Sequence, residues 1–527
     1  MSARTEAAPG HGPQESEKPP LEVENRGLLI VFVMAAMIMQ MLDTTIANVA
    51  LPHMESSLGA TQETVTWVLT SYVLASAVTL PLSGWLVDTF GIKRVLIFSV
   101  VLFTAASALC GVAQSLNQMV LFRVLQGLAG AFLSPVAQTI MLDTSTPEER
   151  PRQMAIYTQG VMLGPIAGPV LGGWITENYT WRWVFFINVP IGILAVFGLL
   201  LLLPNTERRH RKIDITGWVL IAVALSSLQL MLDRGSTKDW FDSGEIVIYA
   251  VVAACSFWMM MVHFVTARNP LFPRELFFDR NFVGSLFLFF LVGMVMMAVL
   301  ALLPGLLQTI YGYPAVDAGW LLAPRGIGML ISVTLFNKQI TRLDPRFALT
   351  LGLGLAGWSL WLMSRWSPDM PMEPIFMTGL IQGVGLSFTF IPLTLLAFAT
   401  LPSKFRADAS ALNNLFRNVG SSVGITICSV LLARNIQLNH AEVGSALRIP
   451  QMPFALDRIT AYGEASDAVM QVMNGMVNKQ AAMLAYLDDF LMMSVLCFAA
   501  IPFLYLLKRN TMPAGPPSAA AADAAGH

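Results

Sequence analysis

The segment GLLIVFVMAAMIMQMLDTTIANVA, residues 27–50, is an apolar run that contains one acidic side chain, Asp43, and no basic one. A helix of about 20 mostly apolar residues is long enough to cross the hydrocarbon core of a bilayer. A backbone surrounded by lipid must also satisfy its own hydrogen bonds, which favours a helix over an isolated strand. The segment therefore predicts a membrane-spanning helix with a carboxyl group buried inside it.

The rest of the chain repeats this apolar pattern. Fourteen runs of similar length can be drawn, and only 12% of the 527 residues are charged. Soluble domains carry about 25% charged residues because their surface needs polar cover. The sequence thus predicts an all-α integral membrane protein surrounded by the lipid bilayer. The net charge of −1 gives no attraction to nucleic acid.

Basic residues orient the predicted spans. If the N-terminus is cytoplasmic, most of the 32 Lys and Arg residues fall in the inside segments, including the run Arg208, Arg209, Arg211 and Lys212. Short cytoplasmic loops of membrane proteins carry such an excess of positive charge. An even number of spans then places both termini in the cytoplasm.

Two halves of the chain match weakly at a nearly constant spacing. Gln126-Gly127 recurs as Gln382-Gly383, and Pro135 recurs as Pro392. The spacing is longer than six spans need, which predicts two six-helix bundles, two extra helices central in the sequence, and a substrate site between the bundles. The expected segments are a disordered N-terminus (1–26), an N-terminal bundle (27–203), two extra helices (204–270), a C-terminal bundle (271–508) with an outer loop (434–485), and a disordered tail (509–527).

The outer loop 434–485 has two interpretations. Its polar composition and mildly helical pattern fit a solvated loop. Its position outside the membrane also fits a docking surface for a periplasmic partner.

Charged side chains inside a span are costly and therefore mark functional sites. At 1.5 Å per residue, Asp43 lies about 24 Å from the inner face and Arg123 about 9 Å from the outer face. These depths add to roughly one hydrocarbon thickness, so the two side chains can share a level. An acid that either an arginine or a proton can neutralise is the minimum for coupling proton movement to a conformational change. A permanent structural ion pair is the alternative.

The segment GWLVDTFGIKR joins two spans on the cytoplasmic side. Gly84 would permit close helix packing, and Gly91 would make a tight turn. Asp88 could cap a facing helix N-terminus, where a negative charge is favourable. Lys93 and Arg94 mark the inner face, so an ordinary positive-inside loop is the alternative to a gating motif.

The segment GVMLGPIAGPVLGGW, from Gly160 to Trp174, places glycines four residues apart on one face of a span. Such spacing lets another helix backbone approach closely. The paired Gly-Pro steps add kinks and indicate a hinge, although packing alone also explains the glycines. The residues of this predicted hinge are Gly164, Pro165, Gly168, Pro169, Gly172 and Gly173.

Further polar residues in the spans are candidates for the wall of a central cavity. They are Gln40, Gln126, Asn413, Asn414 and Arg417. The 30 methionines and 31 phenylalanines fit an adaptable apolar cavity. The sequence has no cluster with metal-ligand spacing and no phosphate-binding loop, so we expect neither an enzyme nor a cofactor, and protons would be the coupling ion.

These motifs resemble those of the fourteen-span drug:proton antiporters of the major facilitator superfamily. LDTTIANVALP (Leu42 to Pro52) is similar to the family's motif with the coupling acid, here Asp43, and RVLQGLAGA (Arg123 to Ala131) to the motif whose arginine serves proton transfer. The loop motif matches except that Ile92 replaces a usual basic residue. GPVLGGW (Gly168 to Trp174) resembles the antiporter signature, which implies export; proton-coupled uptake on the same fold is the alternative.

Two other segments are similar to the EmrB type of this family, namely MLDRGSTKDWF (Met231 to Phe241) and ASALNNLFRNVGSSVG (Ala409 to Gly424). That resemblance implies a bacterial inner-membrane pump that exports hydrophobic or amphipathic small molecules. It also implies a membrane-fusion protein and an outer-membrane channel as partners in a Gram-negative host.

Overall fold

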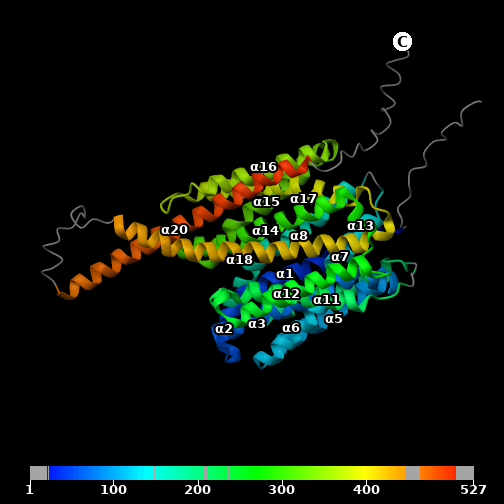
Figure 1. Ribbon diagram of the computed structural model, residues 1–527, viewed down its shortest axis with the longest axis horizontal. Coiled ribbons are helices and arrows are strands. Elements are labelled where there is room, and N and C mark those ends of the chain that lie inside the picture. The colour runs from blue at the N-terminus through cyan, green and yellow to red at the C-terminus, as the bar shows by residue number, and fades with distance from the viewer. Residues whose placement is uncertain are drawn as a thin grey trace, which may run out of the picture.

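The computed structural model describes residues 21, 23–146, 149–206, 208, 211–235, 237–446 and 463–505. These residues are almost entirely helical, and no strand occurs among them (Figure 1). The predicted disorder of residues 1–26 and 509–527 falls mainly outside this part of the chain, and the first helix begins at Arg26.

The helices of the first half form one bundle. They are α1 (Arg26–Leu58), α2 (Gln62–Val65), α3 (Trp67–Thr79), α4 (Ser83–Phe90), α5 (Ile92–Val112), α6 (Leu116–Gly130), α7 (Leu133–Asp143), α8 (Arg150–Asn178), α9 (Trp183–Phe186) and α10 (Asn188–Leu202). Helix α1 packs against α8 and α10, while α6 packs against α3 and α5. Helix α1 is thereby enclosed by its own bundle, which buries Asp43.

The helices of the second half form another bundle. They are α13 (Glu275–Phe278), α14 (Arg280–Thr309), α15 (Ala315–Arg342), α16 (Pro345–Met363), α17 (Met372–Ala399), α18 (Arg406–Ala446) and α20 (Gly463–Leu504). Helix α14 packs along α18, and α17 packs between α15 and α16. Contacts between the two bundles come from α8 against α15 and α17, and from α7 against α18.

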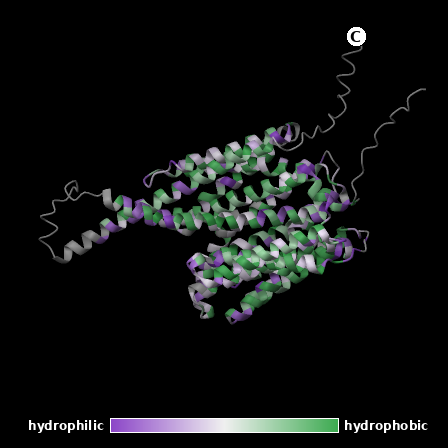
Figure 2. Cartoon of the chain, viewed as in Figure 1, coloured by the Kyte–Doolittle hydropathy of each residue, from purple (hydrophilic) through white to green (hydrophobic). Residues whose placement is uncertain are grey.

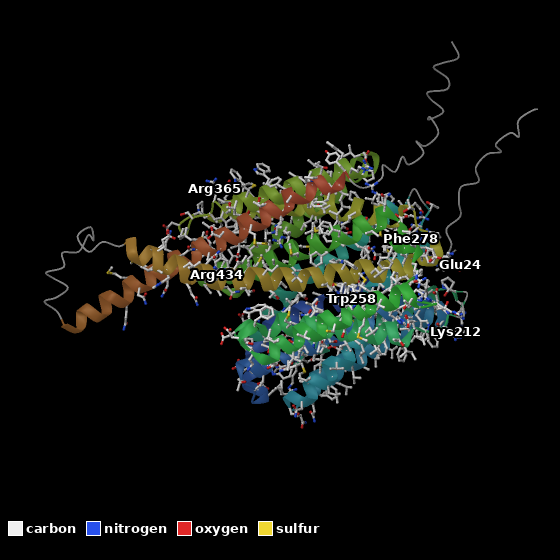
Figure 3. All side chains as sticks on the ribbon, in the orientation of Figure 1. Glu24, Lys212, Trp258, Phe278, Arg365 and Arg434 are labelled. Atoms are coloured by element: carbon white, nitrogen blue, oxygen red, sulfur yellow. The ribbon has the colours of Figure 1, made fainter. Side chains whose placement is uncertain are left out.

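The two extra helices, α11 (Ile215–Gly235) and α12 (Gly244–Thr266), are central in the sequence but peripheral in the fold. Helix α11 packs on α3 and also contacts α18, whereas α12 packs mainly on α11. Large apolar side chains of α12 are exposed, among them Trp258 (Figure 3). Lipid is the environment in which such a surface is stable.

The distribution of polarity is that of a membrane protein. Figure 2 shows apolar residues along the helices and hydrophilic residues gathered toward their ends. The chain enters α1 and leaves α20 at the same end of the molecule (Figure 1). Glu24 and Lys212 lie at this end (Figure 3), together with the loop motif Gly84–Arg94, and we refer to it as the motif end.

Thirteen helical segments in the described residues are long and apolar enough to cross a membrane. They correspond to thirteen of the fourteen predicted runs. The remaining run, residues 152–174, forms α8, a helix of 29 residues that is long enough for a span but less apolar because of its glycines and polar first turns. The predicted all-α membrane fold is confirmed, and the fourteenth span rests on α8.

Residues 434–485, predicted as a polar outer loop with a mildly helical pattern, are helical at both ends. Helix α18 continues to Ala446, and α20 begins at Gly463, so both extend beyond the rest of the molecule as a pair (Figure 1). His440 on α18 contacts Asn474 on α20 at 3.1 Å. Extending an existing helix costs little, and few residues here break one, so each span continues into the aqueous phase.

Candidate functional site

Asp43 lies at the centre of a buried polar cluster in the N-terminal bundle. Its Oδ2 accepts a hydrogen bond from Arg123 Nη1 at 2.6 Å. Its Oδ1 accepts from Gln126 Nε2 at 2.8 Å and from Asn188 Nδ2 at 2.9 Å. All four side chains are buried. The acid and base that the sequence placed at one level therefore form an ion pair.

Arg123 is held in place by groups other than Asp43. Its Nε donates to the Val68 carbonyl at 3.0 Å, and its Nη1 also donates to Gln126 Oε1 at 2.8 Å. Its guanidinium carbon lies 4.3 Å from the centre of the Tyr72 ring, a cation–π contact. The sequence reasoning missed Tyr72 and Asn188, because neither carries a charge or a motif spacing that marks it.

Asp43 accepts hydrogen bonds from three N–H donors. A carboxylate has about four lone-pair positions, so these donors fill most of its capacity as an acceptor. Removing one member of a buried ion pair also leaves an uncompensated charge, which is strongly unfavourable. The three donors therefore hold the Asp43 carboxylate in one position between α1, α6 and α10.

A large cavity of about 1120 Å³ lies beside this cluster, between the two bundles. Arg123 and Tyr72 line it from the first bundle, and Ser422 and Thr426 line it from α18. Helix α11 adds Asp233, an acid that the sequence analysis missed because it follows the predicted end of that span. The cavity includes Thr61 and Thr66 and so lies away from the motif end.

The five residues predicted to line a cavity take other positions. Gln126 belongs to the Asp43 cluster, and Gln40 and Asn413 are buried. Asn414 lies at the bundle interface, where its Oδ1 accepts from Arg417 Nη2 at 2.7 Å. None of these side chains lines the 1120 Å³ cavity.

The loop motif holds the two bundles together at the motif end. Arg211 Nη1 contacts Asp88 Oδ2 at 3.4 Å and Asp408 Oδ2, in the first turn of α18, at 2.8 Å. A Cβ atom on Gly84 would lie only 3.2 Å from Asp408 Cα, so glycine is required for α4 to approach α18 this closely. Arg211 precedes the first extra helix, and thus the linker to that pair takes part in the closure.

The turn of the same motif is formed as the sequence predicts. Gly91 has φ of +85°, a conformation that favours glycine. The Ile92 N–H donates to Thr206 Oγ1 at 2.9 Å, and Lys93 Nζ donates to the Leu200 carbonyl at 2.9 Å. Arg94 is exposed at this end.

A series of polar contacts between α7 and α18 extends the closure. Arg406 Nη1 donates to Asp143 Oδ1 at 2.5 Å, and both residues are buried. Further along the helices, Ser134 Oγ donates to Asn414 Oδ1 at 3.2 Å. The interface between the bundles is thus closed at the motif end and hollow beyond it.

The glycine face of α8 packs on the part of α1 that carries Asp43. A Cβ atom on Gly164 would lie 2.6 Å from the Met41 carbonyl carbon, and one on Gly172 would lie 3.3 Å from the Ile46 carbonyl oxygen. Gly168 meets Thr45 in the same groove, and Thr45 Oγ1 donates to the Gly164 carbonyl at 3.0 Å.

The other members of the predicted hinge differ from these glycines. A Cβ atom on Gly173 would meet nothing within 4 Å, so Gly173 does not belong to the packing face. Pro165 and Pro169 lie within α8, and their side chains are outside the described part of the structure.

The family model "Major Facilitator Superfamily" matches residues 33–425, which include the Asp43 cluster and the loop motif. The chain belongs to the major facilitator superfamily. It is 36% identical over 430 residues to the multidrug export protein EmrB of Escherichia coli (strain K12), covering 81% of this chain and 84% of that protein. It is 32% identical over 496 residues to the fatty acid resistance protein FarB of Neisseria gonorrhoeae, covering 93% of this chain and 97% of that protein.

Solved structures of this superfamily share the fold. The human organic anion transporter MFSD10 has a TM-score of 0.59 with 12% sequence identity, covering 92% of this chain and 100% of the other. At this identity the likeness concerns the fold alone. The family match, the export relatives and the thirteen apolar helices of the described residues identify the chain as a multi-pass membrane transporter.

Proposed function

We propose that this protein is a proton-driven multidrug efflux transporter, which exports hydrophobic or amphipathic small molecules by alternating access. The observation that carries the proposal is the arrangement of Asp43, whose two oxygens face only N–H donors and which borders the cavity through Arg123. In this proposal a proton on Asp43 takes over the neutralising role of Arg123 and frees α1 to move. The names of the relatives EmrB and FarB support export of drugs and of apolar acids as the direction and the cargo.

The proposed orientation places the motif end in the cytoplasm of a bacterial cell and the cavity toward the outside. The positive charges of the linker at this end support it. The structure then corresponds to an outward-facing state, closed inside by Arg211 with Asp88 and Asp408. To load a drug from the inside, these contacts must break while the cavity closes at the opposite end.

The proposed cycle uses the proton to drive this switch. A proton entering through the cavity neutralises Asp43 and releases Arg123, which permits the inward-facing state. The drug binds in the inward-facing state, and Asp43 loses its proton to the cytoplasm. The ion pair with Arg123 then forms again, and the return to the outward-facing state carries the drug to the outside. Hydrophobic cargo requires little polar recognition, which fits a multidrug substrate range.

A membrane-fusion protein and an outer-membrane channel are the proposed partners in a Gram-negative host. In the proposed orientation the paired extensions of α18 and α20 project outward (Figure 1), where such a partner would reach them. Cross-linking from cysteines introduced into these extensions would identify the partner.

The test of the proposed function is Asp43→Asn in membrane vesicles of known sidedness. We expect this variant to insert normally but to lose efflux driven by a pH gradient. Glu177→Gln, an exposed acid at the end of α8, is the matched control and should retain efflux. Full gradient-driven efflux by Asp43→Asn would refute the role of Asp43, and drug accumulation in right-side-out vesicles under an inward proton gradient would refute export.

A further inference from the structure

One buried cation of the C-terminal bundle, Arg325, lacks among the described residues the carboxylate partner that Arg123 and Arg406 have. Arg325, on α15, is 3% exposed, and neither Nη1 nor Nη2 has a hydrogen-bond partner. Among the described residues no acid lies within ion-pair distance of it. A charged group without a partner in a low-dielectric interior is strongly destabilised. This arrangement therefore calls for an anion from outside the chain.

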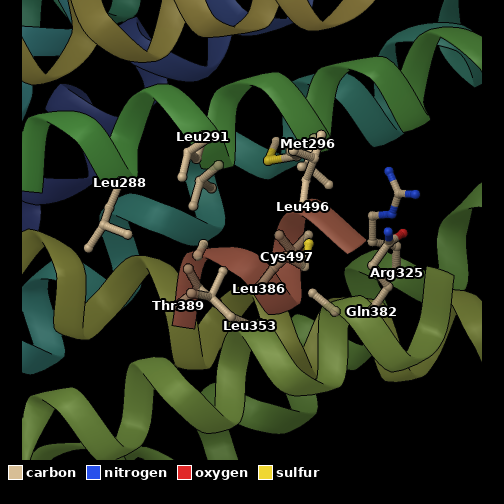
Figure 4. A pocket seen from close by; sticks show the side chains of 14 residues that line it. Leu288, Leu291, Met296, Arg325, Leu353, Gln382, Leu386, Thr389, Leu496 and Cys497 are labelled. Carbon is tan, nitrogen blue, oxygen red and sulfur yellow. The ribbon is translucent and has the colours of Figure 1, made fainter. Parts of the chain in front are cut away.

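The space beside Arg325 has room for a small group. A cavity of about 30 Å³ lies between α14, α15, α16, α17 and α20, enough for a small ion or for the head of a larger molecule. Figure 4 shows Arg325 and Gln382 side by side at one end of this cavity, with apolar residues such as Leu291 and Leu386 along it. Gln382 Oε1 also has no partner. Because amide O and N positions can be exchanged by a flip, Gln382 can offer N–H donors to an anion.

Internal symmetry shows that this cavity is the counterpart of the Asp43 cluster. In the first half, a Cβ atom on Gly127 would clash with the Tyr72 carbonyl; in the second half, one on Gly383 would clash with the Arg325 carbonyl. Arg325 thus takes the place of Tyr72, and Gln382 takes that of Gln126.

The counterpart of the Asp43 cluster in the second half lacks the acid. Met296 lines the cavity and follows Asp43 by the same number of residues as Arg325 follows Tyr72. The first half therefore pairs its buried cation internally, whereas the second half keeps a cation and has a thioether at the position of the acid.

We propose that Arg325 and Gln382 form a binding site for a monovalent anion, and that a negatively charged group of the cargo or a free chloride takes the place that Asp43 fills in the other half. The first source rests on the proposed efflux function and gives the acidic members of its proposed cargo a binding site for their charged group. The polar head would contact Arg325, and the chain would extend along the apolar wall when the bundle opens. Chloride would instead be a resident ion that holds the bundle together.

Thermal unfolding of the full-length protein in lipid nanodiscs tests the site without requiring transport. The probes are octanoate, chloride and octyltrimethylammonium, each added to gluconate buffer, and tryptophan fluorescence reports unfolding. A ligand that binds only the folded state raises the unfolding temperature in proportion to its saturation. We expect octanoate or chloride to raise it in the wild type, and the one that does so identifies the source of the anion. Octyltrimethylammonium matches the chain length of octanoate with the opposite charge and should give no Arg325-dependent shift.

Two variants remove the site in different ways. Arg325→Met removes the cation, while Met296→Asp keeps it and supplies the internal counter-ion that the first half has. Both should need at least tenfold more anion for the same shift. An undiminished response in Met296→Asp, or no response of the wild type to either anion, would overturn the proposal, even if Arg325→Met did not fold. Asp43→Asn should keep the rise in unfolding temperature with anion. The vesicle assay therefore tests the efflux proposal, and the unfolding assay tests the anion site independently of it.

Discussion

Replacing Arg123 by methionine tests whether Asp43 is a charge that only its partner or a proton can neutralise. The guanidinium is fully buried and donates to Asp43, Val68 and Gln126. Removing one member of a buried ion pair costs about 3–5 kcal/mol, because the other charge stays behind without compensation. Gln126 and Asn188 still donate to Asp43, which favours the lower end of this range.

The double variant Asp43→Asn/Arg123→Met isolates the charge. It loses the same donors to Val68 and Gln126 as the single variant but leaves no carboxylate buried. We expect it to be more stable than Arg123→Met by at least about 1 kcal/mol, the lower bound for an unsatisfied buried polar group. Unfolding in nanodiscs, followed by tryptophan fluorescence, measures the difference.

Acid provides a second measurement on the same variants. A proton neutralises the unpaired Asp43, so the unfolding temperature of Arg123→Met should rise toward that of the double variant as the pH falls. The double variant itself has no carboxyl group at this position and should not show this rise. Equal unfolding temperatures of the single and double variants at every pH would show that the cluster does not depend on charge pairing, and the reasoning would fail.

Three other sets of contacts give predictions of their own. Gly164→Val should abolish efflux by forcing α8 off α1, whereas Gly173→Val, where a Cβ atom meets nothing within 4 Å, should retain it in the same vesicle assay. Arg211→Gln should open the motif end and increase labelling by a thiol reagent of a cysteine placed in that interface, whereas Lys212→Gln, an exposed neighbour, should not. The hydrogen bond from Arg26 holds the pKa of Glu149 below its usual value. The contribution of Glu149 to folding stability is therefore present above pH 4.5 and is lost as the pH falls through the folded pKa. Glu149→Gln should lower the free energy of unfolding by at most about 0.5 kcal/mol at neutral pH, because the pair is solvent-exposed, and should have no effect in strong acid.

The sequence predicts the membrane fold and the pair at its centre because both follow from the cost of burial. An apolar run of span length is stable in the lipid bilayer and in few other environments, and a charged side chain inside such a run needs a partner at the same depth. Asp43 and Arg123 could be matched by counting residues along two helices. The turn at Gly91 and the close helix contact at Gly164 can also be predicted from the sequence, because glycine at these positions removes a steric conflict.

Residues that act through three-dimensional contacts were harder to predict. Asn188 and Tyr72 belong to the Asp43 cluster, but an amide and an aromatic ring in an apolar run look like ordinary packing residues. Asp408 pairs with Arg211 across the bundle interface, and neither span boundaries nor spacing indicate which loop meets which helix. The mildly helical pattern beyond residue 434 does not show how far the helices extend, because polar composition fits both a loop and a helix that continues past the membrane until a residue breaks it.

Helix α1 connects the Asp43 cluster to the opposite bundle through packed helices. Helix α1 carries Asp43 on one side and meets the glycine groove of α8 on another, where side chains at Gly164 or Gly168 would clash. Helix α8 in turn packs against α15 and α17 of the opposite bundle. Gly164 lies against the backbone of Met41, so a shift of α1 at this point is not absorbed by side-chain rotation and displaces α8. The Asp43 cluster is therefore connected to α15 and α17 through one packed unit, and in the proposed cycle a shift of α1 would displace α8 relative to the second bundle.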